Sequence, residues 1–358
     1  MPPFGFTRSH TSLRRRVLRL ATMLALPCAA MPACAAGARQ GVVAAEPDAP
    51  RREFWTFVAF WDTASTRTLA RQGAALDVAI TTWIALDSIT GAPTVLHAAP
   101  QSTARGDSLV RRSMALVTSW NGARFHPAAV RRLGADSARL DSAARSIANR
   151  AATLGQRGLV LDFEEHTAAD LPMLRRVIGA IARAARARDV GPVTVAVPAT
   201  DTSAYPAAAL IAAGADAVLP MLYDEHWAGG EPGPVASPEW VRRWLAVRVG
   251  EVGAARVVAG LPFYGYRWPN GGAGETVTYA QAEAAARSAG GRLTRDSASA
   301  TLRAASGGTS IWATDAVLVD TLLRVVDAAG VGRVAFWYIG QEDPRVWPLL
   351  ARRRQADR

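Results

Sequence analysis

Residues 158–165 read GLVLDFEE, an apolar run that ends in acidic side chains. A strand that is apolar on both faces is typical of a parallel sheet covered by helices. Successive side chains of a strand point to opposite faces, so Asp162 and Glu164 point to the same side. We therefore expect a buried parallel strand whose C-terminal end presents two carboxyl groups.

Seven other apolar runs have the same character, and Ala-, Arg- and Leu-rich helical segments separate them. Eight strands that alternate with helices predict an α/β fold of the (β/α)8 barrel type, spanning residues 53–352. The predicted strands are approximately Phe54–Phe60, Leu76–Trp83, Met114–Trp120, Gly158–Phe163, Val193–Val197, Ala217–Met221, Val257–Pro262 and Val334–Trp337. The clearest predicted helices are Asp141–Leu154, Leu171–Ala187, Pro238–Val249 and Asp315–Ala328.

About 70 residues separate the last two predicted strands, which is too long for a simple connection. The interval contains a glycine-rich turn at Asn270–Gly274, a helical pattern at Tyr279–Ala289 and strand-like pieces near Arg292–Arg295 and Ser310–Trp312. We expect a small α+β insertion at about residues 268–314, and a short tail at 353–358.

The N-terminus has the pattern of an export signal. Five arginines precede an apolar stretch at roughly Leu20–Ala30, and Ala33–Ala36 offers a cleavage site. We predict a signal peptide at residues 1–36, similar to twin-arginine signals, and a linker at 37–52. The protein would then be periplasmic, bound to the cell envelope or secreted, with no membrane span after cleavage. A short membrane anchor, or lipid attachment at Cys34, is the alternative.

Composition argues against a nucleic-acid partner. The chain has no lysine, and loss of the five signal arginines would leave +6 of its formal charge of +11. The remaining arginines are spread along predicted helices, whereas nucleic-acid binding favours a clustered basic stripe with aromatic side chains. We expect a monomer that binds no nucleic acid.

Active sites of (β/α)8 barrels lie at the C-terminal ends of the strands. Two inward carboxyl groups as close as Asp162 and Glu164 should share a proton near neutral pH, as a general acid requires. Tyr223 and Met221 end the sixth strand, and Trp337 ends the eighth, where an indole can form a flat floor for a sugar ring. Acids exposed to water, an edge tyrosine and core Met and Trp side chains are the alternative interpretations.

These strand ends together resemble glycoside hydrolase family 18, the chitinase-like enzymes, especially a bacterial branch with spore-cortex-lytic enzymes and domains fused to deacetylases. The family's D-G-x-D-x-D-x-E motif is matched by Gly158, Asp162 and Glu164. Its M-x-Y-D motif is matched at residues 221–224, and the segments 223–227, 232–237 and 260–266 resemble the bacterial branch. The resemblance covers about Phe54–Leu350. The chain departs from the family at Val160 and Arg157, where two acids of the motif are missing.

The resemblance implies substrate-assisted, retaining hydrolysis of glycans that contain β-linked N-acetylglucosamine. Glu164 would protonate the leaving oxygen, Asp162 would orient the substrate's 2-acetamido group, and Tyr223 would donate a hydrogen bond to it. Trp337 would form the floor of the sugar site. Weaker candidates for lining that site are Met221, Asp224 and Tyr264.

The resemblance implies neither a metal nor a cofactor, and the scattered histidines form no metal-binding spacing. We expect His226, near the predicted site, to be structural. Two alternatives stay open. A lectin-like barrel of the same family would bind glycans without cleaving them, and a metal-dependent barrel hydrolase would lose activity with a chelator.

Overall fold

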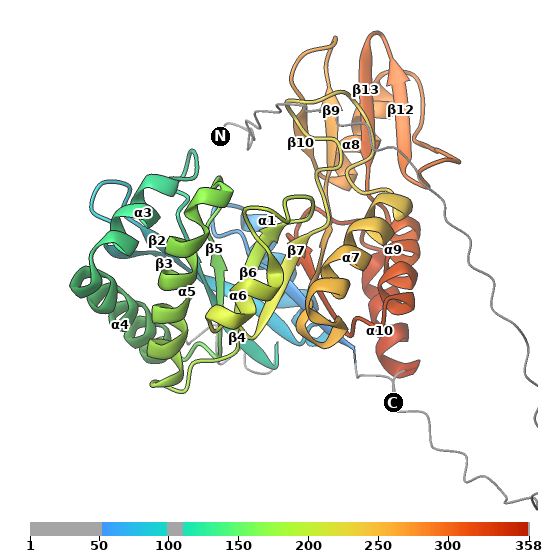
Figure 1. Cartoon of the computed structure of the whole chain (residues 1–358). Coiled ribbons are helices and arrows are strands. Elements are labelled where there is room, and N and C mark those ends of the chain that lie inside the picture. Colours follow the sequence, from blue (N-terminus) through green and yellow to red (C-terminus); the bar gives the residue numbers. More distant parts are fainter. Residues whose placement is uncertain (1–51, 99–109, 357–358) are drawn as a thin grey trace, which may run out of the picture. The chain divides into compact units, whose positions relative to one another are not determined.

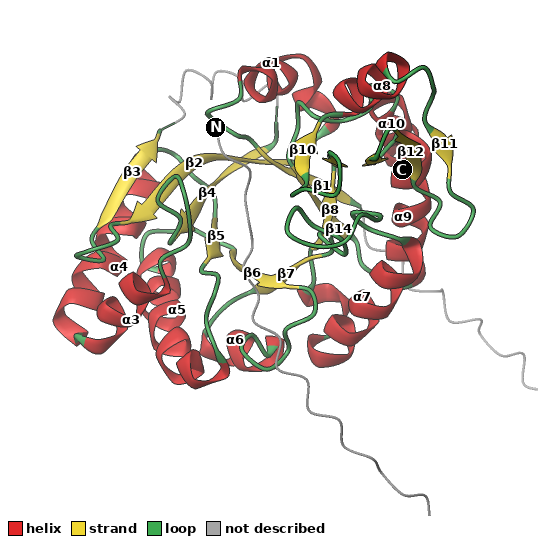
Figure 2. Cartoon of the chain, turned by 90° about the horizontal axis from the view of Figure 1, so that it is seen from above, coloured by secondary structure: helices red, strands yellow, loops and turns green. Residues whose placement is uncertain are grey.

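Eight parallel strands form a closed ring. The computed structural model describes residues 52–98 and 110–356. The ring order is β1-β2-β4-β5-β6-β7-β8-β14, and pairings of β1 with both β2 and β14 close it (Figure 2). The strands are β1 (Glu53–Phe57), β2 (Val78–Leu86), β4 (Arg112–Thr118), β5 (Leu159–Asp162), β6 (Val193–Pro198), β7 (Ala217–Met221), β8 (Ala259–Pro262) and β14 (Arg333–Trp337). The predicted (β/α)8 barrel is confirmed.

Helices surround the ring (Figures 1 and 2). Several begin after an Asp or Ser whose side chain accepts a backbone N–H of the first turn, as at Asp62, Asp136, Ser237 and Asp315. The helices around the barrel are α1 (Thr63–Gln72), α3 (Pro127–Ala135), α4 (Ser137–Thr153), α5 (Leu171–Arg186), α6 (Ala207–Ala213), α7 (Pro238–Val252), α9 (Ala316–Ala328) and α10 (Val346–Ala356). Short 3₁₀ turns lie at Gly73–Ala75, Ala168–Asp170 and Ala254–Arg256.

Strand β5 shows how alternation positions the acids. Leu159 and Leu161 belong to the core between strands and helices, whereas Val160 belongs to the core inside the barrel. Asp162 follows Val160 by two positions, so its side chain continues the inward row. At the start of the strand, a Cβ at Gly158 would lie 2.7 Å from the Met114 side chain and 2.8 Å from the Pro192 carbonyl oxygen. Only glycine fits there, and this close packing fixes β5 against its neighbours.

The insertion is a second sheet. It comprises β9 (Gly265–Trp268), β10 (Glu275–Val277), α8 (Tyr279–Ser288), β11 (Thr294–Arg295), β12 (Leu302–Ser306) and β13 (Thr309–Ala313). Its strands pair in the antiparallel order β10-β9-β13-β12-β11. Figure 1 shows this sheet above one end of the barrel. It begins at Gly265, three residues before the predicted bound.

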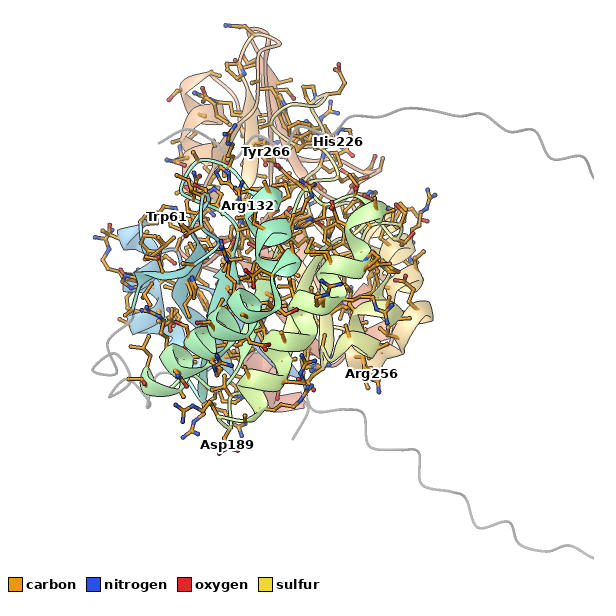
Figure 3. All side chains as sticks on the ribbon, turned by 60° about the vertical axis from the view of Figure 1, so that its left-hand side comes forward. Trp61, Arg132, Asp189, His226, Arg256 and Tyr266 are labelled. Carbon is orange, nitrogen blue, oxygen red and sulfur yellow. The ribbon has the colours of Figure 1, made fainter. Side chains whose placement is uncertain are left out.

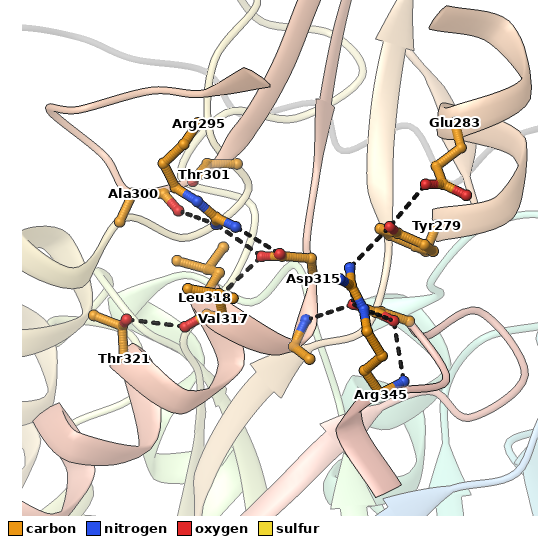
Figure 4. Close-up of polar contacts among 12 residues, drawn as sticks. Tyr279, Glu283, Arg295, Ala300, Thr301, Asp315, Val317, Leu318, Thr321 and Arg345 are labelled. Carbon is orange, nitrogen blue, oxygen red and sulfur yellow. Dashed lines mark hydrogen bonds and ion pairs between the residues drawn. The ribbon is translucent and has the colours of Figure 1, made fainter. Parts of the chain in front are cut away.

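An ion pair and a hydrogen bond join the insertion to the segments that follow it (Figure 4). The Arg295 guanidinium makes two hydrogen bonds to the Asp315 carboxylate, at 2.8 and 2.6 Å. Arg345, which follows β14, donates to the Tyr279 hydroxyl at 2.9 Å, and Tyr279 donates to Glu283 at 2.9 Å. These contacts lie at the base of the insertion, where it meets the segments that follow it.

Three features differ from the sequence expectation. Strand β3 (Pro93–His97) pairs antiparallel with β2 outside the ring, and no helix lies between β2 and β4 within the described residues. Helix α10 continues to Ala356, past the predicted end of the barrel at 352. Helices α1 and α6 were not predicted. Helix α1 has few apolar residues, and the seven residues of α6 are all apolar, so neither segment shows a clear helical periodicity.

The predicted signal peptide at 1–36 and nearly all of the linker at 37–52 lie outside the described residues. Within residues 52–98 and 110–356, no helix has the length and apolar character needed to cross a bilayer.

Candidate active site

A cavity of about 980 Å³ lies at the C-terminal ends of the barrel strands. Figure 3 shows Trp61 and Tyr266, two of its lining residues, toward one end of the barrel, with Asp189 and Arg256 at the other. All seven predicted site residues line this one cavity: Asp162, Glu164, Met221, Tyr223, Asp224, Tyr264 and Trp337. Glu275 and Thr276 of the insertion line it as well.

The two acids are almost fully buried at the bottom of the cavity. Asp162 is 8% exposed and Glu164 is 6% exposed. Burial raises the pKa of Asp162 to about 6, against the opposing effect of hydrogen bonds from Thr118 and Glu164. A hydrogen bond between two carboxyl groups requires a proton on one of them. The pair can therefore hold a proton at a pH where isolated carboxylic acids are ionised.

Thr118 is a site residue that sequence reasoning missed. It ends β4, and its Cα is the register partner of Asp162. Its hydroxyl donates to Asp162 Oδ2 at 3.1 Å and accepts the Trp120 N–H at 3.0 Å. The motif quoted above has an acid at the position of Val160. In this chain the Thr118 hydroxyl supplies a polar partner for Asp162.

Tyr223 and Trp337 lie side by side. Their rings are 6.5 Å apart, with planes 19° from parallel. Burial raises the pKa of the Tyr223 hydroxyl well above 10, with smaller contributions from the nearby acids. The hydroxyl therefore keeps its proton and can donate it in a hydrogen bond. Trp337 is partly exposed to the cavity, and its edge contacts with Phe57 and Tyr338 fix its orientation.

Asp224 forms a cluster with two tyrosines. Its Oδ1 accepts hydrogen bonds from the hydroxyls of Tyr264 and Tyr266, the second at 3.0 Å. Asp224 has φ of 61°, in the left-handed region that Asp tolerates better than most residues. Burial raises the pKa of both tyrosines, so both remain donors. Tyr266 was absent from the predicted set, since its contact depends on the path of the insertion.

A further part of the cavity lining is aromatic and adjoins Trp337, whose ring centroid is 6.3 Å from that of Trp83. Trp61, which follows β1, contacts Trp83 edge-on at 5.0 Å and Trp120 at 5.5 Å between ring centroids. Phe60 contacts both Trp61 and Trp83. Phe60, Trp61, Trp83 and Trp120 all line the cavity, and none of these four was among the predicted site residues. Single aromatic residues after strands carry little sequence signal, because most such side chains belong to cores.

Within the described residues, no group of three His, Cys, Asp or Glu side chains is arranged to hold a metal ion. His226 Nδ1 lies 2.9 Å from the Glu231 carbonyl oxygen, a contact within its own loop. His226 is not among the residues that line the cavity, and its structural role stays a prediction.

Comparisons with solved structures identify the same fold in carbohydrate-active proteins. A chitinase from Chromobacterium violaceum superimposes with a TM-score of 0.74 at 21% identity, covering 86% of this chain and all of that one. The spore cortex-lytic enzyme SleL of Bacillus cereus gives 0.73 at 18% identity, covering 84% and 74%. These likenesses concern the fold.

Sequence similarity is more local. The Bacillus subtilis protein YdhD, named as a sporulation-specific glycosylase, is 32% identical over 121 residues. The match covers 32% of this chain and 29% of YdhD, so the chain matches less than a third of that relative's length. No protein-family model matches the chain. The resemblance is confirmed: the chain has the barrel fold of chitinases and spore cortex-lytic enzymes and shares local sequence with a bacterial protein named as a glycosylase.

Proposed function

We propose that the protein is a glycoside hydrolase that cleaves β-linked N-acetylglucosamine-containing glycans by substrate-assisted, retaining catalysis. One observation carries the proposal: two hydrogen-bonded carboxyl groups, a buried phenol and a partly exposed indole converge on one cavity. The similarity to proteins named as a chitinase, a cortex-lytic enzyme and a glycosylase supports the same class of reaction.

In the first step, Glu164 donates its proton to the glycosidic oxygen and the bond to the anomeric carbon breaks. The oxygen of the substrate's 2-acetamido group attacks that carbon and closes an oxazolinium ring. The carboxylate of Asp162 accepts the acetamido N–H, orients the group and stabilises its positive charge. In the second step, Glu164 removes a proton from water, which opens the ring with net retention.

Tyr223 and Trp337 position the reacting sugar. The protonated Tyr223 hydroxyl donates to the acetamido oxygen, which holds that oxygen toward the anomeric carbon. Trp337 packs against the apolar face of the ring. Asp224, Tyr264 and Met221 complete the pocket for the acetamido group, with the Asp224 carboxylate oriented by its two tyrosine donors.

The substrate class is a polymer or oligomer that contains N-acetylglucosamine: peptidoglycan, chitin-like oligomers or an exopolysaccharide. A cavity of about 980 Å³ is at the upper end of the range for small-ligand sites, and an oligosaccharide matches its aromatic walls. Export by the N-terminal segment would bring the protein to such polymers. A fusion of residues 1–52 to a reporter tests the export, because replacing Arg14 and Arg15 by Lys should block a twin-arginine route.

Product analysis by mass spectrometry tests the function. Residues 37–358 are incubated with purified peptidoglycan and, separately, with N-acetylglucosamine oligomers. We expect cleavage of at least one substrate and a loss of about a hundredfold or more in Glu164→Gln. Asp141→Asn, on the exposed face of α4, serves as the matched control. Binding of the oligomers without cleavage by the parent would favour the lectin-like alternative.

A further inference from the structure

The proton donor lies in an unusual turn. Residues 163–166 connect β5 to the segment before α5, and Glu165 has φ of 62°. This left-handed conformation is unfavourable for glutamate and persists only where surrounding contacts impose it. In a common β-turn, the first carbonyl accepts the N–H of the fourth residue directly. Here a hydroxyl from another loop stands between the two groups.

That hydroxyl belongs to Tyr205, which is 2% exposed. It donates to the Phe163 carbonyl at 2.9 Å and accepts the His166 N–H at 3.0 Å. A single side chain therefore bridges both ends of the turn that carries Glu164. Burial raises the pKa of Tyr205, so the hydroxyl keeps the proton that its donated bond requires.

The loop that carries Tyr205 is held in turn by Arg248 of α7, whose side chain is fully buried. The guanidinium donates to the carbonyl oxygens of Pro198 and Asp201 at 2.6 and 2.9 Å. It also donates to the carbonyl oxygens of Ala199 at 3.3 Å and Tyr205 at 2.8 Å.

A fifth bond, at 2.9 Å, joins the Arg248 guanidinium to the Glu251 carboxylate, which balances its charge. A guanidinium has five N–H donors in a fixed planar fork, and all five are used here. Lysine could not replace this geometry, because its three donors radiate from one point.

We propose that Tyr205 and Arg248 are positioning residues that hold the turn of Glu164 in its catalytic orientation. The inference rests on the proposed function. Neither residue lines the cavity, so both act through the backbone on either side of Glu164. A buried cation stabilises a fold poorly compared with apolar packing, which favours a role in fixing one loop conformation.

Tyr205→Phe tests the proposal, since it removes only the bridging hydroxyl. We expect kcat to fall about tenfold or more, because small displacements of catalytic groups cost this much, while KM changes less than about twofold. The limb of the pH profile that reports the Asp162–Glu164 pair should also shift. A displaced Glu164 side chain would change the hydrogen bond between the two carboxyl groups. Arg248→Lys should also lower kcat and shift the same limb of the pH profile, with little change in KM.

Tyr279→Phe is the matched control. Its hydroxyl also makes two hydrogen bonds, but in the base of the insertion, and Tyr279 does not line the cavity. We expect it to leave kcat and the pH profile unchanged. A Tyr205→Phe enzyme with parental kcat and pH profile, or one changed only as much as Tyr279→Phe, would overturn the proposal.

The crystal structure of Tyr205→Phe separates this inference from the proposed function. A parent that cleaves no N-acetylglucosamine substrate contradicts the function. Even then, the structure of Tyr205→Phe tests the positioning role. A displaced Glu164 side chain and a changed φ at Glu165 would support that role. An unchanged turn in that structure would refute it.

Discussion

Asp162→Asn should stabilise the protein at neutral pH while it abolishes catalysis. The ordinary pKa of the side chain is 3.8, and burial raises it to about 6 in the folded protein. A carboxyl group whose pKa is raised by folding favours the folded state below its ordinary pKa and loses that contribution as pH rises through the folded value. The difference corresponds to at most about 3 kcal/mol, fully expressed above pH 6. Asparagine has no charge to bury, and its carbonyl oxygen can still accept the Thr118 hydroxyl.

Differential scanning calorimetry of parent and Asp162→Asn between pH 4 and pH 8 measures this effect. We expect the variant's advantage in melting temperature to grow from near zero at pH 4 to several degrees at pH 7.5, at about 2 °C per kcal/mol for a chain of this size. Asp141→Asn, on the exposed surface of α4, should show no such pH dependence. An Asp162→Asn variant that is no more stable than the parent at pH 7.5, or equally stabilised at every pH, would refute the burial argument.

Thr118→Val removes a hydrogen bond that lowers the pKa of Asp162, so the limb of the kcat/KM profile set by that group should shift to higher pH; a shift to lower pH would contradict the assigned contact. Trp337→Ala should weaken oligosaccharide binding by about tenfold in calorimetry, since it removes the stacking surface, and unchanged affinity would place the sugar elsewhere. Gly340→Ala should cost about 1–3 kcal/mol in urea unfolding, because φ is 100° and a Cβ would lie 2.6 Å from the Ser65 nitrogen; parental stability would show that the loop can move away.

The barrel could be predicted from sequence because parallel strands buried on both faces leave continuous apolar runs. Strand β5 is the clearest case, and its two-residue alternation placed Asp162 in the inward row. Glu164 lies beyond the end of the strand, in the turn that follows, and still lines the same cavity. Strand β3 was missed because it alternates between partly buried and exposed residues at the edge of the sheet. Its short, half-polar sequence resembles a loop.

Side chains that meet the acids from other elements were beyond sequence reasoning. Thr118 contacts Asp162 through the register of β4 against β5, which fixes a pairing 44 residues apart. Tyr266 reaches Asp224 only because the insertion begins directly after β8. Tyr205 contacts the turn of Glu164 through a backbone carbonyl and a backbone N–H, and Arg248 contacts the loop of Tyr205 through carbonyls. Backbone groups leave no trace in residue identity.

Proton NMR of the first products tests the central claim most directly. The parent enzyme is given an N-acetylglucosamine oligomer and, separately, the same oligomer with its acetyl groups removed. Catalysis by the substrate's acetamido group predicts that the new reducing end appears first as the β anomer and that the deacetylated oligomer is not cleaved. Initial release of the α anomer, or equal cleavage of both oligomers, would contradict it.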